Sequence, residues 1–158
     1  MARVKIGDII EIKTKTGLFY AQYTHRDPEY VELIQVAKVR FDKRPDSLED
    51  IVNAETGIIT FFPVNIAVHR KIFPVIGNIP VPKKRQQFPL FRVAGFPDKK
   101  GKVKQWWFWN GDEAWPEVPV KKLTDEQKRL PIEGIWNDTL LIERLESDWA
   151  PEYDVSTV

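Results

Sequence analysis

Hydrophobic and polar residues alternate in the N-terminal part of the chain, a pattern typical of strands in an antiparallel sheet. After a turn at 7–8, residues 9–13 place isoleucines between charged neighbours and predict a half-buried strand. Two further apolar runs follow at 18–25 and 30–41, each preceded by a short polar turn. Because short turns join the three runs, we expect them to form a meander.

A helical pattern replaces the alternation at 47–57. Ser47 is a suitable N-cap, Asp50 stands at the third helical position, and Gly57 is expected to end the helix. Residues 74–92 are rich in Pro and Gly and carry three consecutive bases, which predicts an exposed loop up to the strand that follows. We predict the remaining strands at 57–64, 66–73, 90–93 and 104–109, with an edge, a bulge or a connection at Pro63.

Helix signals return in the C-terminal part. Thr124 and Gln127 have the spacing of a capping box, and Asn137 and Asp138 are caps for the apolar stripe that follows them. These elements together predict an α+β protein that is mainly β. The expected architecture is a strongly bent antiparallel sheet or SH3-like barrel with an inserted helix and a helical C-terminal extension.

The length of 158 residues fits a single domain, 1–158, with its core at about 4–149 and a C-terminal tail at 150–158. Lys and Arg total 24 against 23 for Asp and Glu, so the net charge of +1 gives no general attraction for nucleic acid or an anionic membrane. The chain has no cysteine, and its start has no apolar run of signal-peptide length. We therefore expect a cytoplasmic protein with no membrane partner.

Reactive side chains do not form a recognisable catalytic or metal motif. His25 and Asp27 share a polar turn, and His69 has no second ligand at a suitable spacing. The serines occupy predicted caps, helix ends or the tail, and the glycines are too widely spaced for a phosphate loop. We predict no catalytic residue, no metal, no cofactor and no enzymatic activity.

Aromatic residues are concentrated at 106–115, WWFWNGDEAW, which holds four of the six tryptophans of the chain. On a strand, Trp107 and Trp109 should face one side while Trp106 and Phe108 face the other, so one pair is expected in the core. The other reading is that the cluster anchors a partner. The predicted partner-binding residues are Trp106, Trp107, Trp109, Asp112, Glu113 and Trp115.

Several segments together resemble immunity protein family 26 of bacterial polymorphic toxin systems. They are IGDIIEIKTKTGLFYAQY, FFPV, VIGNIPVP, PLFR, WWFWNG and LLIERLESDW, and the likeness spans residues 4–149. The resemblance implies a small, largely β intracellular protein that binds and neutralises a cognate protein toxin without catalysis. It implies no fixed set of binding residues, and neither the toxin nor the oligomeric state follows from it.

Two other functions remain open at the level of sequence. The first is a single-stranded nucleic-acid or regulatory binding module on an SH3-like barrel. It is suggested by a basic rim beside the tryptophans, formed by Lys83, Lys84, Arg85 and the lysines at 99–104. The acidic residues beside the same tryptophans and the neutral overall charge count against nucleic acid. In the second, the chain is a hydrolase with an unrecognised carboxylate site, which predicts a deep pocket of carboxylates with raised pKa.

Overall fold

The computed structural model describes residues 3–112 and 114–157, with the backbone alone for 114–117. Its contacts divide the chain into two compact units. Unit 1 contains Met1–Gln87 and Ile135–Asp148, and unit 2 contains Phe88–Gly134 and Trp149–Val158. The sequence was expected to form a single domain, whereas its tertiary contacts gather in two units, each built from two separate stretches of chain.

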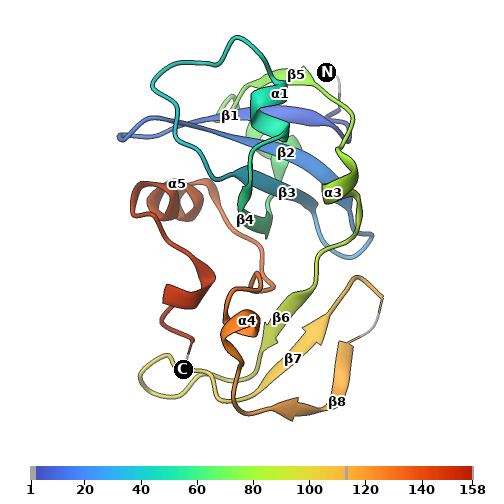
Figure 1. Ribbon diagram of the computed structural model, residues 1–158, viewed down its shortest axis with the longest axis vertical. Helices are drawn as coiled ribbons and strands as arrows, with labels where there is room; N and C mark the ends of the chain where they lie inside the picture. Colours follow the sequence, from blue (N-terminus) through green and yellow to red (C-terminus); the bar gives the residue numbers. More distant parts are fainter. Residues whose placement is uncertain (1–2, 113, 158) are drawn as a thin grey trace. The chain divides into compact units, whose positions relative to one another are not determined.

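Unit 1 is built on a five-stranded antiparallel sheet of order β4-β3-β2-β1-β5 (Figure 1). The first three strands are those predicted from the alternation, although the third is shorter than the apolar run that contains it. In β1, Ile10 and Ile12 are buried while Glu11 is partly buried and Lys13 is exposed, as the alternation predicted. β2 and β3 are largely buried on both faces. The strands are β1 (Asp8–Lys13), β2 (Leu18–Arg26), β3 (Glu32–Ala37), β4 (Thr56–Phe61) and β5 (Val75–Asn78).

Helix α1 (Glu49–Val52) lies in the predicted helical segment but is only four residues long. Leu48 is its N-cap position, and the Ser47 hydroxyl accepts a hydrogen bond from the Glu49 amide at 3.3 Å. The prediction that Gly57 ends this helix was wrong, because Gly57 already belongs to β4. The apolar residues of α1 pack with β1, β2 and β3 in one cluster of the core: Ile9, Tyr20, Ala37, Ile51 and Val52.

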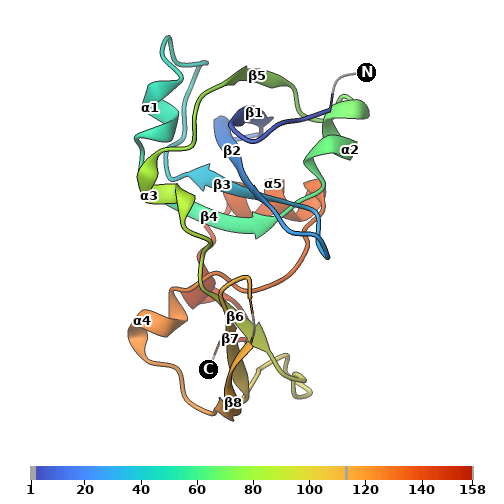
Figure 2. The same ribbon diagram turned by 90° about the vertical axis from the view of Figure 1, so that its right-hand side faces the viewer.

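The strand predicted at 66–73 was also wrong. This segment contains most of helix α2 (Val64–His69), which begins directly after Pro63 (Figure 2). Val64 and Ala67 are buried while Ile66 is exposed, so the apolar positions follow a helical spacing. A short apolar run has no period long enough to separate the two alternatives, and here proline favours the first turn of a helix.

The segment expected to be an exposed loop at 74–92 contains regular structure as well. Strand β5 pairs with β1, and helix α3 (Lys83–Gln86) carries the three consecutive bases. Unit 1 is completed by helix α5 (Asp138–Glu146), for which the Asn137 side chain accepts the Leu140 amide at 2.8 Å, as its sequence predicted. Leu141 and Leu145 are the buried residues of α5.

Unit 2 contains a three-stranded antiparallel sheet of order β6-β7-β8, formed by β6 (Phe91–Ala94), β7 (Trp106–Trp109) and β8 (Ala114–Val120). The sequence pattern predicts β6 and β7 but not β8, whose two prolines argue against a strand. Because β8 lies at the edge of the sheet, those prolines do not break a central ladder.

The rest of unit 2 packs round this sheet. Helix α4 (Asp125–Lys128) has the predicted capping box, in which Thr124 and Gln127 bond each other's backbone amides. The segment treated as a tail, 150–158, forms the 3₁₀ helix η1 (Pro151–Tyr153) and places Thr157 in a buried position. This segment is held by hydrogen bonds to residues far away in sequence, which no local pattern reveals.

The fold is therefore α+β and mainly β, with short helices beside two antiparallel sheets. Strands β4 and β5 end the order of the larger sheet and do not pair with each other, so the described residues form no closed barrel. Within the described part of the chain, no helix has both the length and the apolar character needed to cross a membrane.

Candidate partner-binding surface

The tryptophans of β7 alternate in burial as the sequence predicted. Trp106 and Phe108 are each 1% exposed, whereas Trp107 and Trp109 remain partly exposed. The buried pair joins an apolar cluster with Val103 and Leu123. One face of β7 therefore builds the core of unit 2, and the other face leaves Trp107 and Trp109 partly exposed.

Trp106 is fixed in this core by polar contacts as well as by packing. Its indole nitrogen donates to the Val103 carbonyl at 3.2 Å, and the Arg92 guanidinium lies 4.4 Å from the centre of its ring. A ring with so little exposed surface is not available to a partner in this structure. Trp106 is therefore removed from the predicted contact residues, because its face of β7 is covered by other parts of unit 2.

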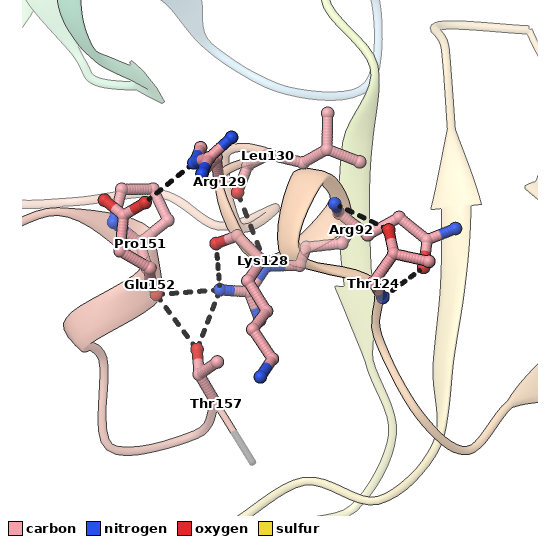
Figure 3. A network of polar contacts seen from close by, with 9 residues as sticks. Arg92, Thr124, Lys128, Arg129, Leu130, Pro151, Glu152 and Thr157 are labelled. Atoms are coloured by element: carbon pink, nitrogen blue, oxygen red, sulfur yellow. Dashed lines mark hydrogen bonds and ion pairs between the residues drawn. The ribbon is translucent and has the colours of Figure 1, made fainter.

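Arg92, which is 0% exposed, connects β6 to the C-terminal segment (Figure 3). Its Nη2 donates to the carbonyls of Pro151 at 2.8 Å and Lys128 at 3.2 Å, and to the Thr157 hydroxyl at 2.8 Å. Burial lowers the pKa of Arg92 to about 10, and the nearby carboxylates of the C-terminal segment oppose this shift. The side chain thus stays protonated at neutral pH and satisfies several backbone acceptors at once.

The opposite face of the sheet carries a second aromatic group. Phe91 pairs with Trp109 in the ladder, and Val93 pairs with Trp107, so these four residues share the face. Phe88 packs edge-on against Trp109 with ring centres 5.3 Å apart, and Phe91 lies 5.8 Å from Trp109. These contacts hold the Trp109 ring in place, so the partly exposed aromatic group is rigidly positioned.

Trp107 occupies the neighbouring position on this face, beside Gly95. A Cβ built on Gly95 would lie 3.3 Å from the Trp107 ring and 3.0 Å from the Gln105 carbonyl. The missing side chain of Gly95 therefore leaves room for the indole to lie close to the backbone of the loop between β6 and β7.

The turn after β7 presents the predicted acidic residue. Gly111 has φ +98°, which favours glycine, and the Asn110 side chain accepts the Asp112 amide at 3.3 Å. Asp112 is exposed at this turn. Glu113 lies outside the described residues. For Trp115 only the backbone is described, and this backbone, in β8, pairs with Phe108 of β7. Both stay predictions from the sequence.

The basic residues proposed for a nucleic-acid rim have different environments. Arg85 was expected on an exposed loop but is 2% exposed, and it donates to the Ala54 carbonyl at 2.7 Å and to Thr56 at 3.1 Å. Lys84 donates to two backbone carbonyls in the segment after α1. Of the three bases, Arg85 is therefore excluded from a surface rim, because its guanidinium is buried and donates hydrogen bonds within unit 1.

The candidate metal and acid/base residues have structural partners. His25 lies in β2, with its Nδ1 2.9 Å from the Thr24 hydroxyl and its Nε2 2.7 Å from the Gln86 carbonyl. Asp27 accepts the Glu29 amide at 2.9 Å, as in an Asx turn. Among the described residues, no three His, Cys, Asp or Glu side chains come together as a metal site.

Arg92, Phe88 and Phe91 organise this part of unit 2 and are not among the contact residues predicted from the sequence. An arginine inside a short run flanked by phenylalanines and tryptophans is a usable signal for a buried cation–π contact. Its hydrogen-bond partners lie 36 to 65 residues further along the chain, so spacing alone does not find them.

No protein-family model, curated protein or solved structure matches the chain.

Proposed function

We propose that this chain is a non-catalytic immunity protein that binds and neutralises a cognate polymorphic toxin in the bacterial cytoplasm. The observation that carries the proposal is the face of β7 on which Trp107 and Trp109 are partly exposed, followed by a turn that exposes Asp112. Rigid tryptophans next to a charged residue have the composition of a protein-binding hot spot. The resemblance of the sequence to immunity protein family 26 points to the same class of partner.

The structure narrows the contact residues that we propose. Trp107 and Trp109 are the aromatic anchors and Asp112 is the charged contact, while Glu113 and Trp115 are retained from the sequence alone. A rigid aromatic loses little conformational entropy when it becomes buried, so the packing of Phe88 and Phe91 against Trp109 favours tight binding. If the toxin is a nuclease, its cleft is basic, and the acidic turn is complementary to it.

We also infer that the sheet of unit 1 is an SH3-like roll. The order β4-β3-β2-β1-β5 and the single short helix between β4 and β5 support this assignment. It serves the proposal as a scaffold, because binding proteins of this kind act through surfaces and loops rather than through a buried catalytic centre.

The test is co-expression with the toxin domain encoded next to the gene, followed by measurement of cell survival and of the dissociation constant. Replacing Trp107 or Trp109 by Ala is expected to weaken binding by about 30-fold or more, the level of a hot-spot residue. Asp112→Asn is expected to reduce the association rate and its dependence on salt.

Two exposed residues of unit 2 provide matched controls, Tyr153→Ala for the loss of an aromatic ring and Asp125→Asn for the loss of an acidic charge. Both controls should bind as the unaltered protein does. The proposal fails if the neighbouring toxin neither binds nor is neutralised. The assignment of the surface fails if binding persists unchanged in the tryptophan variants.

A nucleic-acid module is the second candidate, and Phe96 is the observation that favours it. Phe96 is 99% exposed at the start of the loop between β6 and β7, which also presents the exposed Lys99, Lys100 and Lys104. An aromatic ring among lysines is suited to stacking on an unpaired base. This function predicts that an oligothymidylate binds in low salt, is released in high salt, and is lost in Phe96→Ala.

A further inference from the structure

Unit 1 contains a polar pocket of about 140 Å³ at one end of its sheet. Three segments that are distant in sequence surround it: the N-terminal residues Arg3 and Val4, the β2–β3 hairpin, and the beginning of α2. The hairpin contributes two tyrosines, one arginine and one glutamate to the lining. The pocket is distinct from the aromatic face of β7, which belongs to unit 2.

Backbone hydrogen bonds hold the walls of this pocket together. The Asn65 side-chain oxygen accepts the Val4 amide at 3.2 Å, which fixes the N-terminal segment against α2. The Glu32 carboxylate accepts the Asn65 amide at 2.9 Å, and its backbone carbonyl accepts the Phe62 amide at 2.9 Å. The site is therefore built before any ligand arrives, and one oxygen of its carboxylate is already used by the protein.

Tyr23 is the most informative residue of the lining. It is 3% exposed, and its hydroxyl lies within hydrogen-bond reach of the Arg26 side chain, so the two groups line the pocket together. Burial and the charge of Glu32 raise the pKa of Tyr23, while Arg26 acts in the opposite direction, so the hydroxyl keeps its proton at neutral pH. A protonated tyrosine hydroxyl can donate as well as accept, so a ligand oxygen in the pocket is placed to accept from Tyr23.

Two arginines add further donors. Arg3 and Arg26 both line the pocket, and neither forms an ion pair with a carboxylate of the described residues. With Glu32 included, the lining carries two positive charges and one negative charge, which leaves a surplus of one positive charge. The surplus suits a monoanion whose oxygens accept from a guanidinium and a hydroxyl together.

We propose that this pocket binds a carboxylate group, with Arg26 and Tyr23 as its donors and Arg3 at its entrance. The volume allows a small ligand, since a water molecule takes about 30 Å³ of liquid volume. Tyr30, stacked on Phe61 with ring centres 4.7 Å apart, supplies an apolar wall for the carbon part of the ligand. The carboxylate belongs either to a free small acid or to an Asp or Glu side chain of a protein partner. This inference does not depend on the proposed function.

The test is a titration of the ¹⁵N-labelled protein with sodium acetate at constant ionic strength, followed by amide chemical shifts. Saturable shifts are expected at Val4, Arg26 and Asn65, with no equivalent change on addition of sodium chloride. The isosteric change Tyr23→Phe is expected to weaken acetate binding by about tenfold, as the loss of one charge-assisted hydrogen bond would. Arg26→Gln should weaken it further, and Arg26→Lys should restore part of the affinity.

Arg40→Gln, which removes an exposed arginine elsewhere in unit 1, is the control and should bind acetate unchanged. A second titration with N-acetyl-glutamate methylamide separates the two sources, because tighter binding of this probe than of acetate indicates a protein side chain. Amide spectra establish that each variant is folded. Shifts that do not saturate, that chloride reproduces, or that persist in Tyr23→Phe and Arg26→Gln overturn the proposal.

Discussion

Arg92 shows how one residue can hold together a unit that has a small apolar core. Its guanidinium stacks on Trp106 and donates to acceptors from α4 and from the C-terminal segment. A buried charge is costly unless hydrogen bonds compensate for it, and here backbone carbonyls provide most of them. One nitrogen, Nη1, is buried without a partner within the described part of the chain, so the compensation is incomplete.

Replacing Arg92 by Met should therefore destabilise the protein by about 3 kcal/mol or more, because several buried acceptors lose their donor at once. The free energy of unfolding in urea, followed by tryptophan fluorescence, measures this cost. Arg129→Ala removes a 69% exposed arginine that lies 3.6 Å from Glu152, and its effect should stay within about 0.5 kcal/mol. Equal effects of the two changes would show that Arg92 does not organise unit 2.

Glu11 makes the stability of unit 1 depend on pH. The hydrogen bond that Glu11 accepts from Arg44, at 2.7 Å, lowers the pKa of Glu11 below the usual 4.5. Burial raises this pKa, and the hydrogen bond from the Tyr20 hydroxyl lowers it further. A lowered pKa in the folded state contributes stability above pH 4.5 that is lost as the pH falls through the folded value.

The expected result is that the free energy of unfolding decreases below pH 4.5 and that Glu11→Gln reduces this decrease. Urea unfolding at pH 7 and at pH 3 measures both proteins under identical salt. The exposed Glu49, to which no arginine side chain of the described residues donates a hydrogen bond, provides the control change Glu49→Gln. An identical pH dependence in Glu11→Gln and the unaltered protein would contradict the assignment.

At the scale of elements, the turn between β7 and β8 decides where the candidate surface ends. Gly111 adopts a positive φ, and a Cβ at this position would lie 2.9 Å from the Phe88 ring. The glycine thus serves two purposes, since it allows the turn and lets Phe88 approach the backbone closely. Phe88 in turn packs on Trp109, so the turn and the aromatic face are coupled through one ring.

Gly111→Ala is expected to cost about 1–2 kcal/mol for the left-handed backbone alone, with a further cost for moving Phe88. Urea unfolding measures the cost, and the near-ultraviolet circular dichroism of the aromatic residues reports the displacement of the rings. Gly134→Ala is the matched control, because nothing lies within 4 Å of its added Cβ and its φ is not positive. That change should leave stability unaltered or raise it by less than about 1 kcal/mol.

At the scale of the whole molecule, the chain is not divided into two consecutive halves. It passes between the units after Gln87, after Gly134 and after Asp148, so both units depend on the C-terminal part of the sequence. Unit 1 takes α5, and unit 2 takes residues 149–158, which supply acceptors to Arg92 and pair with Val103 through the Ser156 carbonyl at 3.0 Å.

Ending the chain after Asp148 should therefore weaken unit 2 far more than unit 1. Amide hydrogen exchange is expected to accelerate in β6 and β7, while β1, β2 and β3 keep their protection and provide the internal control. Uniform acceleration in both sheets would show that the two units unfold as one cooperative body, and no change in β6 would show that the C-terminal segment is dispensable.

The sequence by itself determined the features that depend on neighbouring residues. The alternation at 9–13, the apolar run at 18–25, the caps at Thr124 and Asn137, and the two faces of β7 all follow from a local pattern or a local hydrogen bond. Such features leave a pattern because the residues that form them lie within one or two turns of each other. The mainly β class of the fold followed from them.

Only the tertiary structure decided the rest. The segment at 66–73 is too short for its period to separate helix from strand, so its surroundings chose the helix. Arg85 and Arg92 became interior residues because distant carbonyls replace water around their charges, and the last residues became part of unit 2 through the same contacts. These partners lie about 30 to 65 residues away along the chain, beyond the reach of any local pattern.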